Sequence, residues 1–234
     1  MVFVAGMKVM NSLEVLYEDN HIIVVVKPNN ILSQADNTGD VDMLSIIKYY
    51  LKKKYNKPGN VYLGLVHRLD RPVSGVMVFA KTSKAASRLS NQVREHIFKK
   101  TYLAIVNNID IDDSGEYLDY IVKQNDNSSK VVDNENGKYC KLMYNTLERN
   151  KKLNLALVKV DLETGRHHQI RVQFSHHNHA LYGDQRYGKR DNNQICLHAY
   201  RLEFNHPITK EKMTFEKKPP QLGMWLNFNA VSSM

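Results

Sequence analysis

The stretch HRLDRPVSGVMVFA, residues 67–80, places one carboxylate, Asp70, between the cations Arg68 and Arg71. The residues PVSG at 72–75 are typical of a tight turn, and the apolar run at 76–80 predicts a buried strand. The stretch therefore predicts that Asp70 lies at the end of a rigid strand, where functional side chains are commonly mounted.

A carboxylate beside two arginines is favoured in its ionised form, because opposite charges attract. An ionised Asp70 serves as a nucleophile or a base in an active site, or it forms an ordinary ion pair at a strand end. This stretch alone leaves both interpretations open.

Composition limits the class of protein. The 234 residues, 42% of them hydrophobic, are enough for one domain with a core. Lys and Arg number 33 against 24 acids, and the formal net charge of +9 favours a polyanionic partner, either nucleic acid or a membrane surface. No stretch reads as a membrane span or a secretory signal. Two cysteines without a CxxC pair predict a reducing compartment, cytoplasmic or organellar.

Around the opening stretch, the sequence predicts both strands and helices. Runs rich in β-branched or apolar residues predict strands at residues 13–28 (as a hairpin), 76–81, 101–106, 138–147 and 153–162. Helical spacing predicts helices within 39–59, from Ser83 onward as the cap, and after the Thr164-Gly165 turn. Polar residues predict surface hairpins over 110–136, and a closing hairpin is expected around His206-Pro207.

Three further segments each have two interpretations. The run Lys52-Lys53-Lys54 is a solvated helix end or an RNA contact. Tyr102, in the strand KKTYLAIV, is a core residue or an aromatic platform. The segment TGRHHQIR, residues 164–171, is an anion-binding helix start or a basic, solvated amphipathic helix.

Histidines are frequent in the same region and raise the question of zinc. They are His167, His168, His176, His177 and His179. No HExxH motif occurs and no carboxylate is interleaved with them, so we interpret them as surface or core residues and predict no metal site.

Five segments in order make the chain similar to RluA-type pseudouridine synthases. They are VLYEDNHIIVVVKP, HRLDRPVSGVMVFAKT, KKTYLAIV, TGRHHQIRVQFSHHNHALYGDQRYG and LHAYRLEFNHPIT. The resemblance implies the α/β (α+β) pseudouridine synthase fold, with a mixed, mainly antiparallel sheet, flanking helices and a central RNA-binding cleft. It also implies a short N-terminal extension at residues 1–12 and a single catalytic domain over 13–234, without the S4 domain that many relatives carry.

The resemblance implies roles for individual residues. Asp70 matches the catalytic aspartate, Tyr102 the tyrosine that stacks on the target base, and Arg166 the arginine paired with the catalytic carboxylate. Supporting or substrate-binding roles are implied for His67, Arg68, Arg71, His168, Gln169, Arg171 and Leu197. Val73 and His167 depart from the family pattern, which bears on positioning and substrate choice.

The implied activity is the isomerisation of uridine to pseudouridine in ribosomal or transfer RNA. This reaction breaks the C1′–N1 bond, rotates the uracil and rejoins it through C5, without redox or phosphoryl chemistry, so no cofactor is expected. RNA is the expected partner of a monomeric, cytoplasmic enzyme. The alternatives are a catalytically silent RNA-binding protein of the same fold and a metal-dependent nuclease that uses the histidines.

Overall fold

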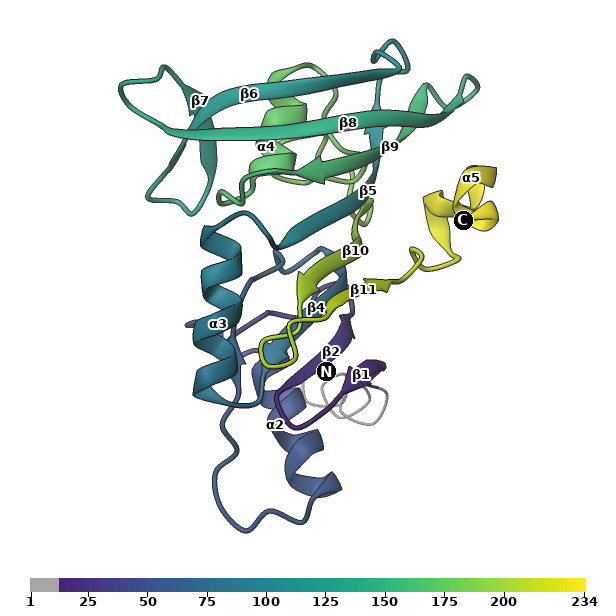
Figure 1. The fold of residues 1–234 in the computed structure, drawn as a ribbon. Helices are drawn as coiled ribbons and strands as arrows, with labels where there is room; N and C mark the ends of the chain where they lie inside the picture. The colour runs from purple at the N-terminus through teal and green to yellow at the C-terminus, as the bar shows by residue number, and fades with distance from the viewer. Residues whose placement is uncertain (1–12) are drawn as a thin grey trace. The chain divides into compact units, whose positions relative to one another are not determined.

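The computed structural model describes residues 13–234, so the predicted extension at 1–12 lies outside the described residues. The chain forms two compact units (Figure 1). Unit 1 contains the described residues up to Phe98 together with Arg201–Lys217, and unit 2 contains Lys99–Tyr200 together with Lys218–Met234. Residues 13–234 contain eleven strands, four α-helices and one 3-10 helix, which confirms the α+β prediction.

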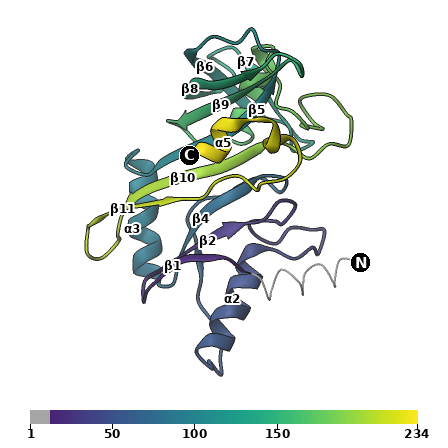
Figure 2. The same ribbon diagram turned by 90° about the vertical axis from the view of Figure 1, so that its right-hand side faces the viewer.

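Unit 1 is built on two buried strands. Strand β2 (Ile22–Lys27) pairs antiparallel with β1 (Val15–Glu18) on one side and with β4 (Ser74–Ala80) on the other, as Figure 2 shows. The short β3 (Gly64–Leu65) also pairs with β4. All seven residues of β4 are buried, which explains why its residues 76–80 are continuously apolar rather than alternating.

Helix α3 covers one face of these strands. It spans Ser83–Arg94, and its Ala85 and Leu89 pack with residues of β2 and β4 in one core cluster. The cap of this helix differs by one residue from the prediction. Thr82, not Ser83, is the N-cap, because its backbone is extended and its side chain accepts a hydrogen bond from the backbone N–H of Ala85 at 3.2 Å.

The predicted helix within residues 39–59 is α2, Met43–Lys54. Asp42 caps it by accepting from the backbone N–H of Ser45, and lysines fill its last turn, where they complement the helix dipole. The predicted closing hairpin is also present in unit 1, where residues 201–205 of β10 (Leu197–Asn205) pair antiparallel with β11 (Lys212–Glu216).

Unit 2 is a five-stranded antiparallel arrangement. Its order is β5 (Lys99–Asn107), β9 (Leu155–Leu162), β8 (Lys138–Asn150), β6 (Ser114–Lys123) and β7 (Ser129–Val132). The polar segment 110–136 thus forms the predicted hairpin, with Tyr117, Asp119 and Ile121 on the buried face of β6. Helix α4 (Gln169–His176) lies against β6 and β7 (Figure 1).

The C-terminal part of unit 2 was not predicted from the sequence. A 3-10 helix, Gly223–Asn227, and helix α5, Asn229–Ser233, add Trp225, Phe228 and Val231 to a core cluster with residues of β5 and β9. Neither these helices nor any other within residues 13–234 has the length and hydrophobicity that crossing a bilayer requires.

Glu18, at the end of β1, is a hydrogen-bonding centre of unit 1. Its side chain is 5% exposed and accepts hydrogen bonds from Lys54, Lys81 and Tyr55, each at 2.7 Å. Burial raises the pKa of this carboxyl, but the hydrogen bonds from the two lysines and the tyrosine outweigh burial and lower the pKa to about 2. The cluster links the first strand to α2 and to the end of β4.

We expect Glu18→Gln to lower the free energy of unfolding by about 1–2 kcal/mol at pH 7, because charge-assisted hydrogen bonds are lost. The folded-state pKa lies below the ordinary value of 4.5, so the contribution of Glu18 is present above pH 4.5 and is lost as the pH falls toward 2. Urea unfolding of the wild type and of Glu18→Gln should therefore show a difference in the free energy of unfolding at pH 7 that becomes smaller toward pH 3. The control Glu95→Gln, at an exposed position, should unfold with the same free energy as the wild type. An equal difference for Glu18→Gln at both pH values would contradict a stabilising role of the ionised Glu18 carboxylate.

Candidate active site

Asp70 lies in a turn that leads directly into β4. The backbone N–H of Val73 donates to the carbonyl oxygen of Asp70 at 3.0 Å and closes a turn over residues 70–73. The sequence predicts the turn two residues later, at 72–75, but Ser74 and Gly75 belong to β4. Exposure alternates before it, with His67 and Leu69 buried, Arg68 exposed and Asp70 half-buried. The loop therefore presents one carboxylate and one arginine at the surface of unit 1 while its apolar side chains hold it in the core.

Lys27, the last residue of β2, lies beneath this turn and is fully buried. Its Nζ donates to the carbonyl oxygens of Pro28 at 3.0 Å, Arg71 at 3.0 Å and Val73 at 2.6 Å. Burial lowers the pKa of this lysine to about 7, although the Asp70 carboxylate acts in the opposite direction. Lys27 thus fixes the turn and is also an electrostatic neighbour of Asp70.

Two further side chains hold the backbone around Asp70. The Oγ of Ser33 donates to the carbonyl oxygen of Leu69 at 2.7 Å and accepts from the N–H of Leu69 at 3.1 Å. The amide of Asn29 donates to the carbonyl oxygen of Pro72 at 2.7 Å. Because hydrogen bonds fix the backbone at Leu69 and at Pro72, the backbone position of Asp70 between them is also fixed.

The other predicted residues of unit 1 have different surroundings. Arg71 is exposed and forms an ion pair with Asp40 at 2.6 Å. His67 is buried, its Nε2 accepts from the backbone N–H of Val78 at 3.2 Å, and its ring packs 5.2 Å from that of Phe98. His67 therefore supports β4, whereas Arg71 is oriented by the carboxylate of Asp40.

In unit 2, Tyr102 lies in β5 opposite Val160 of β9 and is 6% exposed. Two residues before it on the same face of the strand, Lys100 is half-buried, and burial lowers its pKa. A Cβ at Gly165 would come within 3.0 Å of the Lys100 Nζ, so the glycine leaves space for this lysine beside the segment that leads to Arg166.

Gln169 organises that segment from within. It is buried, its Oε1 accepts from the Thr164 hydroxyl at 2.8 Å and from the backbone N–H of Arg166 at 3.0 Å, and its Nε2 donates to the carbonyl oxygen of Lys141 at 3.1 Å. The side chain of Arg166 is exposed, and its Nε donates to the carbonyl oxygen of Tyr139 at 2.9 Å. The geometry makes Gln169 the scaffold that presents Arg166.

The remaining predicted residues also have internal partners. Arg171 and Asp184 form a buried bidentate ion pair with two contacts of 2.8 Å. Burial raises the pKa of Asp184, but the hydrogen bonds and charge of Arg171 outweigh it and lower the pKa. The Nδ1 of His168 lies 2.7 Å from the Tyr187 hydroxyl, and Leu197 is buried at the start of β10.

A family model described as RNA pseudouridylate synthase matches residues 21–176, two thirds of the chain, and this range includes Asp70, Tyr102 and Arg166. The chain belongs to this family. Ribosomal large subunit pseudouridine synthase D of Pseudomonas aeruginosa is 34% identical over 233 residues, covering 92% of this chain and 71% of that protein. Ribosomal large subunit pseudouridine synthase C of Buchnera aphidicola is 33% identical over 211 residues, covering 85% of this chain and 65% of that protein.

Solved structures of family members share the fold. Human RNA Pseudouridylate Synthase Domain Containing 4 superposes with a TM-score of 0.76 at 22% identity, covering 94% of both chains. Human RNA Pseudouridylate Synthase Domain Containing 1 superposes with a TM-score of 0.74 at 20% identity, covering 96% of both chains. The predicted RNA pseudouridine synthase family, its enzyme class and its fold are thus confirmed. The chain spans about two thirds of the length of the curated relatives, 65% and 71% for the two bacterial proteins.

Within this pseudouridine synthase, the structure groups the predicted residues by unit. Unit 1 holds Asp70 with His67, Arg68 and Arg71, and unit 2 holds the remaining six. Sequence reasoning missed Lys27 and Lys100, although one signal was present for each. Lys27 ends an apolar strand directly before Pro28, and Lys100 lies one strand repeat before Tyr102.

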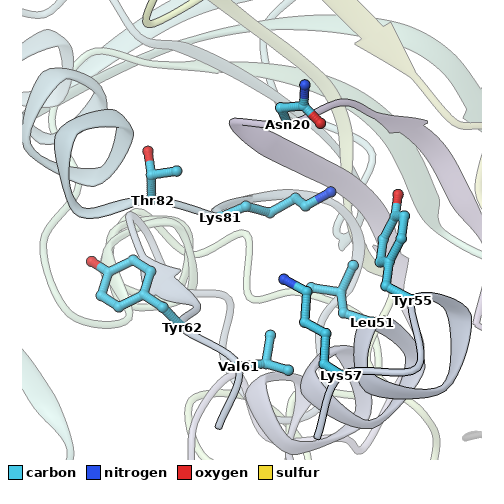
Figure 3. A pocket seen from close by; sticks show the side chains of 8 residues that line it. All are labelled: Asn20, Leu51, Tyr55, Lys57, Val61, Tyr62, Lys81 and Thr82. Carbon is cyan, nitrogen blue, oxygen red and sulfur yellow. The ribbon is translucent and has the colours of Figure 1, made fainter. Parts of the chain in front are cut away.

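Unit 1 also contains a pocket of about 350 Å³ (Figure 3). Its lining includes Tyr55, Lys57, Tyr62, Lys81 and Thr82, and none of the described residues predicted for the site. The ammonium groups of Lys81 and Lys57 lie 5.1 and 5.9 Å from the centre of the Tyr55 ring. The pocket therefore adjoins the Glu18 cluster, with which it shares Tyr55 and Lys81.

We expect Lys27→Met to destabilise the synthase by at least about 2 kcal/mol, because the carbonyl oxygens of the Asp70 turn lose their buried donor. Thermal and urea unfolding measure this change. The control Lys57→Met, which removes a pocket lysine of unit 1, should change stability by less than about 0.5 kcal/mol. Similar stability for both variants would show that the turn does not depend on Lys27.

Proposed function

We propose that this protein isomerises specific uridines in ribosomal or transfer RNA to pseudouridine, with Asp70 as the catalytic carboxylate. The observation that carries the proposal is the setting of Asp70. It lies in the segment matched by the family model, in a turn fixed by Lys27 and Ser33, with its side chain half-buried. The relatives named as ribosomal RNA enzymes, and a tRNA pseudouridine synthase C of Pectobacterium carotovorum that is 31% identical, support the substrate class.

The chemistry needs one ionised carboxylate and a rigid site. The C1′–N1 bond of uridine breaks, the uracil turns, and a C1′–C5 bond forms, so the product has the same atoms as the substrate. An ionised Asp70 starts this sequence by attacking the sugar or the base, or by removing a sugar proton. Lys27 lies beneath the Asp70 turn and responds electrostatically to the Asp70 carboxylate, and the balance of atoms requires no organic cofactor.

Unit 2 supplies the other proposed catalytic groups. We assign Tyr102 as the ring that stacks on the uracil, since a detached base must be retained until it is rejoined. Arg166 is assigned as the catalytic arginine because it lies in the segment that the family model matches, and its side chain is exposed beside the buried Gln169. Gly165, the residue before Arg166, leaves space for the Lys100 ammonium group.

RNA is the proposed partner of a monomeric enzyme in the cytoplasm. A uridine in folded RNA must be flipped out at a cost of a few kcal/mol, and contacts between cations and phosphates offset this cost. The net charge of +9 and the exposed Arg68 next to Asp70 are suited to such contacts.

The first test is tritium release from RNA that carries uridine labelled at C5, because the label leaves when C5 bonds to C1′. We expect the wild type to release tritium and Asp70→Asn to be at least about 10³-fold slower, since the reaction loses its ionised group. RNA affinity, measured by filter binding, should change by less than about threefold. Ribosomal and transfer RNA fractions are assayed separately so that the responding fraction names the substrate.

The alternatives give different results. Binding of RNA without tritium release from either fraction by the wild type would support the silent RNA-binding protein. Shortening of the RNA that stops when a chelator is added would support the nuclease. Release that persists in Asp70→Asn would remove the catalytic assignment while leaving the reaction itself established.

Tyr102 is tested by two substitutions that separate its ring from its hydroxyl. Tyr102→Phe retains stacking, so we expect turnover within about tenfold of the wild type, whereas Tyr102→Ala loses the platform and should be at least about 10²-fold slower. Tritium release under single-turnover conditions measures both. Equal losses in the two variants would assign the function to the hydroxyl instead of the ring.

A further inference from the structure

Three side chains of unit 2 that have no part in the proposed reaction come together at the end of α4. Asp119 belongs to β6, His176 is the last residue of α4, and His177 follows it. One ligand atom from each lies within 4.8 Å of the other two. We propose that Asp119, His176 and His177 form a binding site for a divalent transition-metal ion of the zinc type.

Two of the ligand atoms already have suitable spacing. The Nε2 of His177 lies 3.1 Å from the Oδ2 of Asp119. Zinc binds imidazole nitrogen and carboxylate oxygen at about 2.0–2.1 Å, and an ion at that distance from both atoms would make an angle of about 100°, close to tetrahedral. An ion can therefore replace the hydrogen bond between these groups with little movement of either side chain.

Neighbouring side chains hold both of these ligands in place. The Nε2 of Gln173 donates to Asp119 Oδ2 at 2.7 Å and to the carbonyl oxygen of Tyr117 at 3.2 Å. The ring of His177 stacks on that of Tyr117, with centroids 3.9 Å apart and an interplanar angle of 4°. Such outer contacts orient metal ligands and reduce the entropy lost on binding.

His176 provides the third ligand and distinguishes a metal site from an ordinary ion pair. It is exposed, and its ring centroid lies 5.1 Å from that of His177. If Asp119 and His177 were only an ion pair, His176 would have no part in it. If His176 is a ligand, its exposed ring can bind an ion from the solvent and bring it to the buried carboxylate of Asp119.

The donor set selects the class of metal. Two imidazoles and one carboxylate are ligands of zinc, and a water molecule completes four-coordination when the protein supplies three. Magnesium prefers an octahedron of oxygen atoms, so this cluster should discriminate against it.

The test is isothermal titration of the full chain with Zn²⁺. Each ligand is changed while its local contacts are kept. Asp119→Asn retains an oxygen for Gln173, His177→Phe retains a ring on Tyr117, and His176→Asn alters only an exposed side chain. The matched control is His96→Asn, because His96 is also exposed, lies in unit 1, and has a φ of 56° that asparagine tolerates.

We expect one Zn²⁺ per chain, a dissociation constant at least about tenfold larger in each of the three variants, and no change in His96→Asn. Mg²⁺ should give no saturable binding, and Co²⁺ bound in place of Zn²⁺ should show the visible absorption of tetrahedral coordination. Absence of saturable Zn²⁺ binding, or affinity that His176→Asn leaves unchanged, would overturn the proposal. Because the readout is metal binding, the result is independent of tritium release and of the proposed function.

Discussion

Burial of the Lys27 ammonium group is the constraint on which the candidate active site depends. Removing a charge from water costs several kcal/mol unless it gains strong partners. Lys27 gains three carbonyl oxygens, those of Pro28, Arg71 and Val73, and two of them belong to the turn that follows Asp70. The chain can satisfy this lysine only by keeping that turn in one conformation, so the same interaction that offsets burial also fixes the catalytic candidate.

The same principle organises unit 2, where buried polar side chains hold the loop and leave other residues free to act. Gln169 is surrounded by partners from its own unit, and Arg171 forms a buried bidentate pair with Asp184. These residues have the geometry of a scaffold. Arg166, by contrast, extends from that scaffold with an exposed guanidinium group. The motif TGRHHQIR thus divides its residues between holding a loop and presenting one arginine.

The proposed metal site combines residues that follow the TGRHHQIR motif with a residue from a distant part of the chain. His176 and His177 end the helix that begins with Gln169, yet their carboxylate partner, Asp119, comes from a strand more than fifty residues earlier in the chain. Side chains alternate between the two faces of β6, which places Asp119 on the buried face, and a hydrogen bond from Gln173 of α4 orients its carboxylate. A metal at this position would join α4 to the sheet of unit 2.

Sequence alone determined the family and most of the strands and helices, because these depend on local patterns and on motifs that stay intact along the chain. The two C-terminal helices, which complete a core cluster with β5 and β9, were established only by the tertiary structure. The turn after Asp70, the helix capped by Asp42 and the strand of Tyr102 all follow from residues that are neighbours in sequence. The roles of Lys27 and Asp119 were decided only by the tertiary structure. A buried lysine and a carboxylate acquire a function from the groups that folding brings against them, and those groups lie tens of residues away, where no local pattern reports them.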